Sequence, residues 1–192
     1  MKPREMLKGK MIDMSDLSDF SKACKAKGKK IVFTAGSWDM LHVGQMRYLT
    51  EAKKLGDVLV VGVNSNASIR AVKGITKPIL DEWIRAESLT FLKCVDFVTI
   101  VPTPSCQPAL EILKPDFFVS VKEDWAKDVK DSKEYKTVTE NGGEVVIIDR
   151  QSPFVSTTSI VERMIGGHFA EIFEKYLNRQ EDPIKERFDK PE

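Results

Sequence analysis

The sequence has little of what a secreted or membrane-bound protein needs. Its three cysteines form neither an even set nor a CxxC pair, so we expect reduced thiols buried as small apolar side chains. No apolar run approaches the roughly 20 residues of a membrane-spanning helix. No N-terminal stretch combines a basic region, an apolar core and a small-residue cleavage site. We therefore expect a cytoplasmic protein without a membrane partner.

An excess of charge of one sign is also missing. The 30 lysines and arginines nearly balance the 29 acidic residues, so no overall field favours nucleic acid as a partner. Internal repeats and low-complexity segments are absent from the sequence as well. The 192 residues suffice for one well-buried domain, and we expect its partners to be small molecules.

Apolar, β-rich runs alternate along the chain with helical patterns. The expected strands are 31–34, 57–63, 95–101, 116–121 and 144–149, and the expected helices include a leading helix after Ser15 and segments at 42–56, 81–94 and 105–114. This alternation predicts an α/β fold: a Rossmann-like, doubly wound parallel sheet of five strands with helices on both faces. Ligands of such sheets bind at the carboxyl ends of the strands, where the strand order reverses.

The two ends of the chain differ from this alternating middle. We expect an N-terminal extension at 1–14, one domain at 15–167, and a C-terminal amphipathic helix with a charged tail at 168–192. In that last segment Phe169, Ile172, Phe173 and Tyr176 share one face. Apolar helical faces near both termini could cover the core or form an interface. Since closed dimers are the commonest assembly, we expect a homodimer.

The stretch GSWDMLHVGQ directly follows the first expected strand. Gly36 allows a sharp turn and the close approach of an anion to backbone N–H groups. His42 lies near the start of the next helix, three positions before Gln45, so both side chains share a face beside the positive end of the helix dipole. Gly44 leaves that approach open. The alternative is an ordinary strand-to-helix turn in which the histidine is merely packed.

Three adjacent hydroxyl side chains, those of Ser156, Thr157 and Thr158, come just before another apolar helical pattern. Together with the N–H groups of a helix N-terminus they can receive an anion. The alternative is plain helix capping, and the two roles can coexist.

Taken together, these two motifs resemble those of the small cytidylyltransferase-like nucleotidyltransferases. That family has the hallmark G-[ST]-F-D-x-x-H-x-G-H, and VSTTSIVERM at 155–164 is similar to its second motif, I-S-T-T-x-I-[IV]. The resemblance runs from about Ser15 to Met164 and is closest to the ADP-heptose synthase adenylyltransferase branch, which is related to glycerol-3-phosphate cytidylyltransferase.

This resemblance implies a reaction in which a phosphorylated sugar or polyol attacks the α-phosphorus of ATP or CTP and pyrophosphate leaves. It also implies Mg²⁺ bound with the nucleoside triphosphate, held mainly by triphosphate oxygens and waters without dedicated metal ligands from the protein.

Roles follow from the resemblance residue by residue. The catalytic group is expected to be His42, Gln45 and Lys73. The nucleotide is expected to contact Thr34, Ala35, Gly36, Ser37, Asp39, Gly44, Arg85, Ser156, Thr157 and Thr158. Weaker candidates for the acceptor or a phosphate are Arg70, Asn64, Lys122 and Asp124. Asp39 would brace the turn or, alternatively, cap the following helix.

Several positions depart from the family pattern. Gln45 stands where a second histidine is expected; it can donate a hydrogen bond to a phosphate but cannot carry charge or pass a proton, so we expect a slow enzyme. Trp38 replaces the hallmark phenylalanine, Asn66 replaces an acid, and Ile84 also replaces an acid. The loop VSVKEDW lacks the family's glycine pair.

Three hypotheses remain at this point. The first is a nucleotidylyltransferase, with ATP favoured over CTP because DRQSPFV lacks the R-T-x-G-I text typical of the cytidylyl branch. The second is a nucleotide-binding homologue with weak or lost turnover that serves as a regulatory or assembly subunit; Gln45 and the altered loop favour it. The third is a plain structural α/β domain, in which both motifs would be coincidences.

Overall fold

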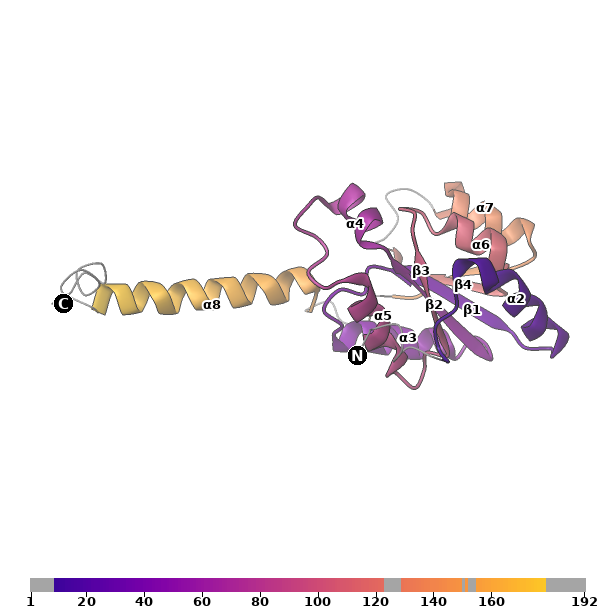
Figure 1. Cartoon of the computed structure of the whole chain (residues 1–192), viewed down its shortest axis with the longest axis horizontal. Coiled ribbons are helices and arrows are strands. Elements are labelled where there is room, and N and C mark those ends of the chain that lie inside the picture. The colour runs from indigo at the N-terminus through magenta and orange to yellow at the C-terminus, as the bar shows by residue number, and fades with distance from the viewer. Residues whose placement is uncertain (1–8, 123–128, 150, 152–154, 179–192) are drawn as a thin grey trace, which may run out of the picture. The chain divides into compact units, whose positions relative to one another are not determined.

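The computed structural model describes residues 9–122, 129–149, 151 and 155–178. The chain divides into two units, Met1–Phe154 and Val155–Glu192, and each is described by itself. The first unit contains the sheet with its covering helices, and the second contains one long helix (Figure 1).

A five-stranded parallel sheet forms the centre of the first unit. Its strands are β1 (Ile31–Gly36), β2 (Val58–Asn64), β3 (Phe97–Val101), β4 (Phe117–Ser120) and β5 (Glu144–Ile147), in the order β3-β2-β1-β4-β5. The predicted Rossmann-like fold is confirmed. Strand order reverses between β1 and β4, so the crevice beyond their carboxyl ends is where such a sheet receives a ligand.

Helices cover both faces of this sheet (Figure 1). They are α2 (Leu17–Ala26), α3 (Val43–Lys53), α4 (Asn66–Lys73), α5 (Glu82–Thr90), α6 (Gln107–Leu113) and α7 (Lys133–Glu140), with short 3-10 turns η1 (Met14–Asp16) and η3 (Val129–Asp131). One apolar core includes Leu17, Leu110 and Val138 of α2, α6 and α7. The other includes Leu49 of α3 and Leu89 of α5. Both strand faces are therefore buried, as the continuous apolar runs predicted.

The last residues of the expected N-terminal extension at 1–14 contact the sheet. Lys10 and Ile12 pair with β3 beyond its outer edge: Val98 N–H donates to Lys10 O at 2.8 Å, and Ile12 N–H donates to Val98 O at 2.9 Å. The ammonium of Lys10 also donates to three carbonyls at and beyond the end of α5. This segment covers an otherwise open sheet edge, so it is part of the fold.

The second unit contains the C-terminal helix. Its helix α8 runs over Thr157–Asn178 and therefore begins well before residue 168. Ser156 and Ser159 fix that start: Ser159 N–H donates to Ser156 Oγ at 3.0 Å, and Ser156 N–H donates to Ser159 Oγ at 2.9 Å. Gly166 and Gly167 weaken the helix but lie inside it. Among the described helices, none has the length and apolar character to cross a membrane.

Asp116, directly before β4, ties this strand to β1. Its carboxylate accepts hydrogen bonds from Lys30 Nζ at 2.8 Å and from Ile31 N–H at 2.9 Å. Although burial raises the pKa of Asp116, these hydrogen bonds and the charge of Lys30 hold it below the ordinary value. The stability that this carboxylate contributes is complete above the ordinary carboxyl pKa and is lost as the pH falls through the lower, folded-state pKa.

We predict that Asp116→Asn lowers the midpoint of urea unfolding at pH 7, and that its difference from the wild type narrows below about pH 4. Urea titrations at pH 7 and at pH 3.5 measure both effects. Asp19→Asn is the control, because Asp19 lies on the surface with only an exposed Lys22 beside it. A constant difference at both pH values would contradict the assignment.

Candidate active site at the carboxyl ends of β1 and β2

The turn after β1 has a strained shape that its residues explain. Trp38 and Met40 have positive φ angles of 51° and 47°. The indole of Trp38 is buried and donates from Nε1 to Gly62 O at 2.9 Å, beside Gly36. A Cβ atom at Gly36 would lie 3.2 Å from that ring. Tryptophan in place of the hallmark phenylalanine therefore anchors the turn to β2 through a hydrogen bond that phenylalanine cannot make.

His42 and Gln45 form a capping box at the start of α3. His42 is the N-cap residue, and its side chain faces the N–H of Gln45, while Gln45 Oε1 accepts the N–H of His42 at 3.1 Å. Because a backbone N–H can only donate, the atom facing it must be the amide oxygen of Gln45. The amide nitrogen is left to donate elsewhere. Both side chains are half-buried at the positive end of the α3 dipole.

This cap gives Gln45 a local structural reason. Glutamine is a preferred residue three positions after an N-cap, because its side chain reaches back to the N-cap N–H. The same geometry leaves Gln45 one donating group and no positive charge. That position 45 lacks a charged contact with a phosphate therefore stays a prediction. The donor available there is the amide nitrogen of Gln45.

Asp39 braces the turn instead of capping the helix. Its buried carboxylate accepts hydrogen bonds from Ile79 N–H at 2.8 Å and from Leu80 N–H at 3.0 Å. The loop before α5 is thereby fixed to the turn after β1. Of the two alternatives for Asp39, the structure contains the brace, since the N-cap of α3 is His42.

Arg85 on α5 has a fully buried side chain. Its guanidinium donates to Leu80 O at 3.0 Å, to Asn64 O at 2.8 Å, to Asn66 Oδ1 at 2.9 Å, and to Ser37 O. Burial lowers the pKa of Arg85, and nearby carboxylates, first among them that of Asp39, oppose this effect. These bonds make Arg85 a positioning residue that joins the ends of β1 and β2; its contact with a nucleotide stays a prediction.

The remaining predicted residues differ in their surroundings. Thr34 is buried, and its hydroxyl shares a hydrogen bond with Tyr48 Oη at 2.9 Å. The positions along the turn and at the end of β2 are half-buried or buried: Ala35, Gly36, Ser37, Gly44 and Asn64. The basic side chains are exposed: Arg70 and Lys73 on α4, and Lys122 just beyond β4. Asp124 lies outside the described residues.

The hydroxyl motif belongs to the second unit. Ser156 acts as the N-cap of α8, so the capping alternative is present there. Thr157 is half-buried and Thr158 is exposed, at the first two positions of the helix. An anion-binding role of these three residues stays a prediction.

Sequence reasoning noted Asn66 only as a departure, but the structure gives it a central position. Its side-chain amide donates to Asp81 Oδ2 at 2.7 Å and accepts a hydrogen bond from the Arg85 guanidinium. Its backbone N–H donates to Glu82 Oε2 at 2.5 Å. An aspartate at 66 would place two carboxylates against each other. The signal available in the sequence was the pair of adjacent acids, Asp81 and Glu82, shortly before Arg85.

The fold and this site define an α/β protein whose first strand-to-helix turn presents backbone donors and a histidine at a topological switch point. The family model described as cytidylyltransferase-like matches residues 33–163. The chain belongs to this family, which confirms the resemblance read from the two motifs, and the family supports nucleotidyltransfer in general.

Curated relatives point in the same direction. The bifunctional protein HldE of Geobacter metallireducens is 39% identical over 166 residues, which cover 84% of this chain and 32% of that protein. The bifunctional protein HldE of Nitratiruptor sp. is 42% identical over 155 residues, which cover 79% of this chain and 31% of that protein. The chain thus spans about a third of the length of these relatives.

Solved structures support the fold. A lipopolysaccharide core biosynthesis protein from Thermoplasma volcanium superimposes with a TM-score of 0.53 at 29% identity, covering 64% of this chain and 97% of that one. A pantoate-β-alanine ligase from Francisella tularensis has a TM-score of 0.52 at 15% identity, covering 73% and 66%, and shows a likeness of fold alone.

We predict that Asn66→Asp lowers the free energy of unfolding by about 1 kcal/mol more when residue 81 is aspartate than when residue 81 is asparagine. The exchange Asn66→Asp with Asp81→Asn keeps one amide and one carboxylate in contact and retains a side chain that can cap α5. Urea unfolding of the wild type, both single variants and the double variant gives the coupling energy. Additive effects of the two substitutions would contradict this account of Asn66.

Proposed function

We propose that the chain is a nucleotidylyltransferase that moves AMP, or CMP, from a nucleoside triphosphate to a sugar or polyol phosphate and releases pyrophosphate. The observation that carries this proposal is the His42–Gln45 cap at the N-terminus of α3, directly beyond Gly36 at the switch point. Membership of the cytidylyltransferase-like family supports it.

The chain's own groups suit an in-line displacement at phosphorus. A phosphate oxygen of the acceptor forms the new bond to the α-phosphorus while the bond to pyrophosphate breaks. Such a reaction needs positioning and stabilisation of negative charge. The α3 N-terminus, His42 and the Gln45 amide nitrogen are fixed donors at the turn, and the exposed cations Lys73, Arg70 and Lys122 supply positive charge.

Mg²⁺ enters this proposal with the nucleotide. The described residues contain no group of three or more His, Cys, Asp or Glu side chains that could hold a metal ion. The two carboxylates nearest the turn are also committed, since Asp39 accepts two backbone N–H groups and Asp81 caps α5. The donors that remain at the turn fit phosphate, so the triphosphate and water would hold Mg²⁺, which would neutralise part of the triphosphate charge.

ATP is the nucleotide we favour, and a phosphorylated sugar the acceptor. The relatives named bifunctional protein HldE and the lipopolysaccharide core biosynthesis protein support a sugar-linked substrate. Since nucleoside triphosphates and phosphorylated sugars are small soluble molecules, we propose that the reaction takes place in the cytoplasm.

A nucleotide-binding subunit without turnover is the second candidate. One observation favours it: the amide oxygen of Gln45 is already bound to His42 N–H, and the remaining amide nitrogen can neither carry charge nor pass a proton. The fixed donors would then bind a nucleotide without accelerating its reaction.

We predict that pyrophosphate release with ATP, Mg²⁺ and a suitable sugar phosphate falls by about 10²–10³-fold in His42→Ala, because a fixed donor at developing charge is lost. Gln45→Glu should preserve the cap and thermal stability, since a carboxylate still accepts the His42 N–H, but should reduce release by a similar factor. Gln45→His should raise release by about 10²-fold, because the imidazole can be charged. The assay uses ATP, CTP, GTP and UTP against a panel of sugar and polyol phosphates.

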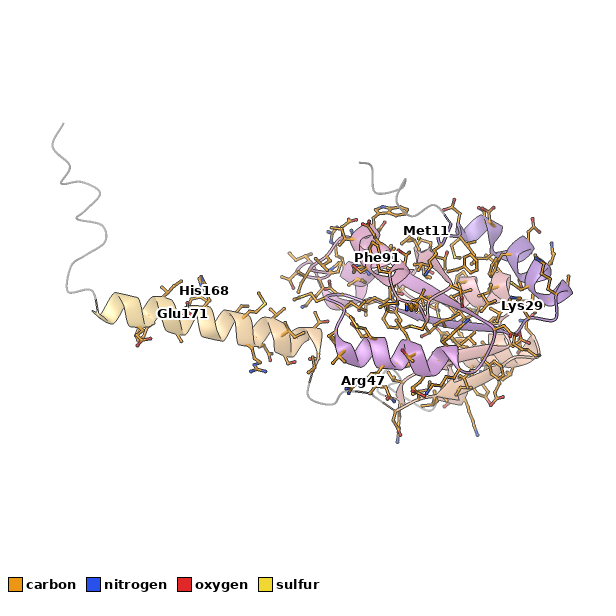
Figure 2. All side chains as sticks on the ribbon, turned by 90° about the horizontal axis from the view of Figure 1, so that it is seen from below. Met11, Lys29, Arg47, Phe91, His168 and Glu171 are labelled. Carbon is orange, nitrogen blue, oxygen red and sulfur yellow. The ribbon has the colours of Figure 1, made fainter. Side chains whose placement is uncertain are left out.

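His168→Ala is the matched control, because His168 is the other histidine of the chain and lies on α8 (Figure 2). Its release should equal that of the wild type. No release by the wild type or by Gln45→His with any pair, together with tight nucleotide binding in calorimetry, would reject the transferase and favour the binding subunit.

A further inference from the structure

The two ring nitrogens of His42 have different surroundings. Nδ1 is shielded from water by the protein, and the His42 side chain faces the backbone N–H of Gln45 at the start of α3. A neutral imidazole carries one proton, either on Nδ1 or on Nε2, and a charged imidazole carries both. The place of the proton therefore decides what this side chain can do in the site.

The geometry of the capping box disfavours a proton on Nδ1. This nitrogen is the one nearer the backbone, so it is the ring atom that an N-cap side chain turns towards the N–H of the third helical residue. A backbone N–H can only donate, so a proton on Nδ1 would set two donors against each other out of contact with water. Burial of a polar group in that arrangement is unfavourable. The single proton of a neutral ring therefore belongs on Nε2.

The position of His42 also opposes a charged imidazole. His42 is the N-cap residue of α3 (Val43–Lys53), so its ring lies at the positive end of the helix dipole. A cation at this end of a helix is disfavoured. A helix N-terminus can hold an imidazole neutral and still leave it one hydrogen bond to donate.

The charged groups of the candidate site nearly balance one another. The first turn of α3 contains no acidic residue. The acids on the neighbouring turn and on α5 each accept backbone N–H groups, and they are Asp39, Asp81 and Glu82. The cations come from α5, from α4 and from the residues just beyond β4, and they are Arg85, Arg70, Lys73 and Lys122. The capping box and the helix dipole are therefore left to decide the protonation of His42.

We infer that Gln45 is a positioning residue for His42, which it holds as a neutral imidazole with its proton on Nε2. The amide oxygen of Gln45 fixes the backbone of His42 by accepting its N–H at 3.1 Å, and the backbone N–H of Gln45 orients the ring. His42 is then a donor of one hydrogen bond and neither a cation nor a base. The inference rests on the proposed function only in naming a phosphate oxygen as the group that receives this bond.

Nitrogen NMR of the full chain, labelled at its histidines, tests the protonation state directly. The chain has two histidines, so His168→Ala leaves His42 as the only labelled ring. At pH 5.5 an ordinary imidazole is about nine-tenths charged, and the urea-unfolded chain should show this value. In the folded chain we expect about one fifth or less to be charged, with a proton on Nε2 and none on Nδ1. A His42 charged as in the unfolded chain, or a neutral His42 with its proton on Nδ1, would overturn the inference.

A second variant tests the positioning role of Gln45. Gln45→Ala removes the amide oxygen that holds His42, so the ring can turn towards water and its charged fraction at pH 5.5 should rise about threefold or more. Thr50→Ala is the matched control, because Thr50 is an exposed, uncharged residue of the same helix, and its spectrum should equal that of the parent chain. Circular dichroism shows whether each variant is folded. An unchanged charged fraction in folded Gln45→Ala would contradict the positioning role.

ATP with Mg²⁺ is the probe for the phosphate contact. At pH 7 its addition should move the Nε2 resonance of His42 more than the Nδ1 resonance, because Nε2 carries the donated proton. A larger change at Nδ1 would overturn the contact. Failure of ATP to bind in calorimetry would count against the proposed function, whereas the spectra recorded without ATP decide the state of His42 by themselves.

Discussion

The buried guanidinium of Arg85 is the constraint on which the candidate site depends. A positive charge without water contact is tolerated only if protein oxygens surround it, and the loss of a partner of a buried charge costs about 3–5 kcal/mol. Here those oxygens belong to the ends of β1 and β2 and to the loop before α5. The backbone at Ser37 and Asn64 is thus held in one arrangement before any ligand arrives. Asp39 strengthens this arrangement, because its carboxylate accepts the N–H groups of Ile79 and Leu80 in the loop before α5.

The departures from the family pattern fall into two groups, according to whether they help to maintain the geometry around Arg85. Trp38 and Asn66 make new contacts inside the protein, with Gly62 O and with Asp81 and Arg85, so they maintain the geometry of the site by other means. Gln45 is different, because its amide oxygen accepts the His42 N–H and its amide nitrogen can only donate a hydrogen bond. Trp38 and Asn66 would suit a catalytic site and a binding site equally well, so they do not distinguish the two functions. The choice between these functions therefore depends on Gln45 and on the altered loop after β4.

The sequence predicted the sheet well because strands buried on both faces produce continuous apolar runs. It did not predict α4 and α7, because each has only eight residues and a helical period is hard to recognise over two turns. Ser65 and Ser132 start these helices by accepting backbone N–H groups. Pairing at Lys10 and Ile12 uses backbone atoms that carry no sequence signal. At the site, motifs identified Gly36 and His42. The positioning role of Arg85 was hidden, because burial and partners are tertiary properties.

The donors of the candidate site and its cations differ in how firmly they are held. The α3 N-terminus, His42 and Gln45 are held by the capping box, and the turn that carries them is anchored by Trp38 and Asp39. The lysines and the arginine that would balance a triphosphate in the proposed function are exposed side chains. A charge held in water is screened and must be ordered when ligand binds, whereas a fixed donor is already oriented. In the proposed transferase, recognition of the nucleotide would therefore rest on the rigid part of the fold, and most of the charge compensation would come from side chains that the ligand itself must order.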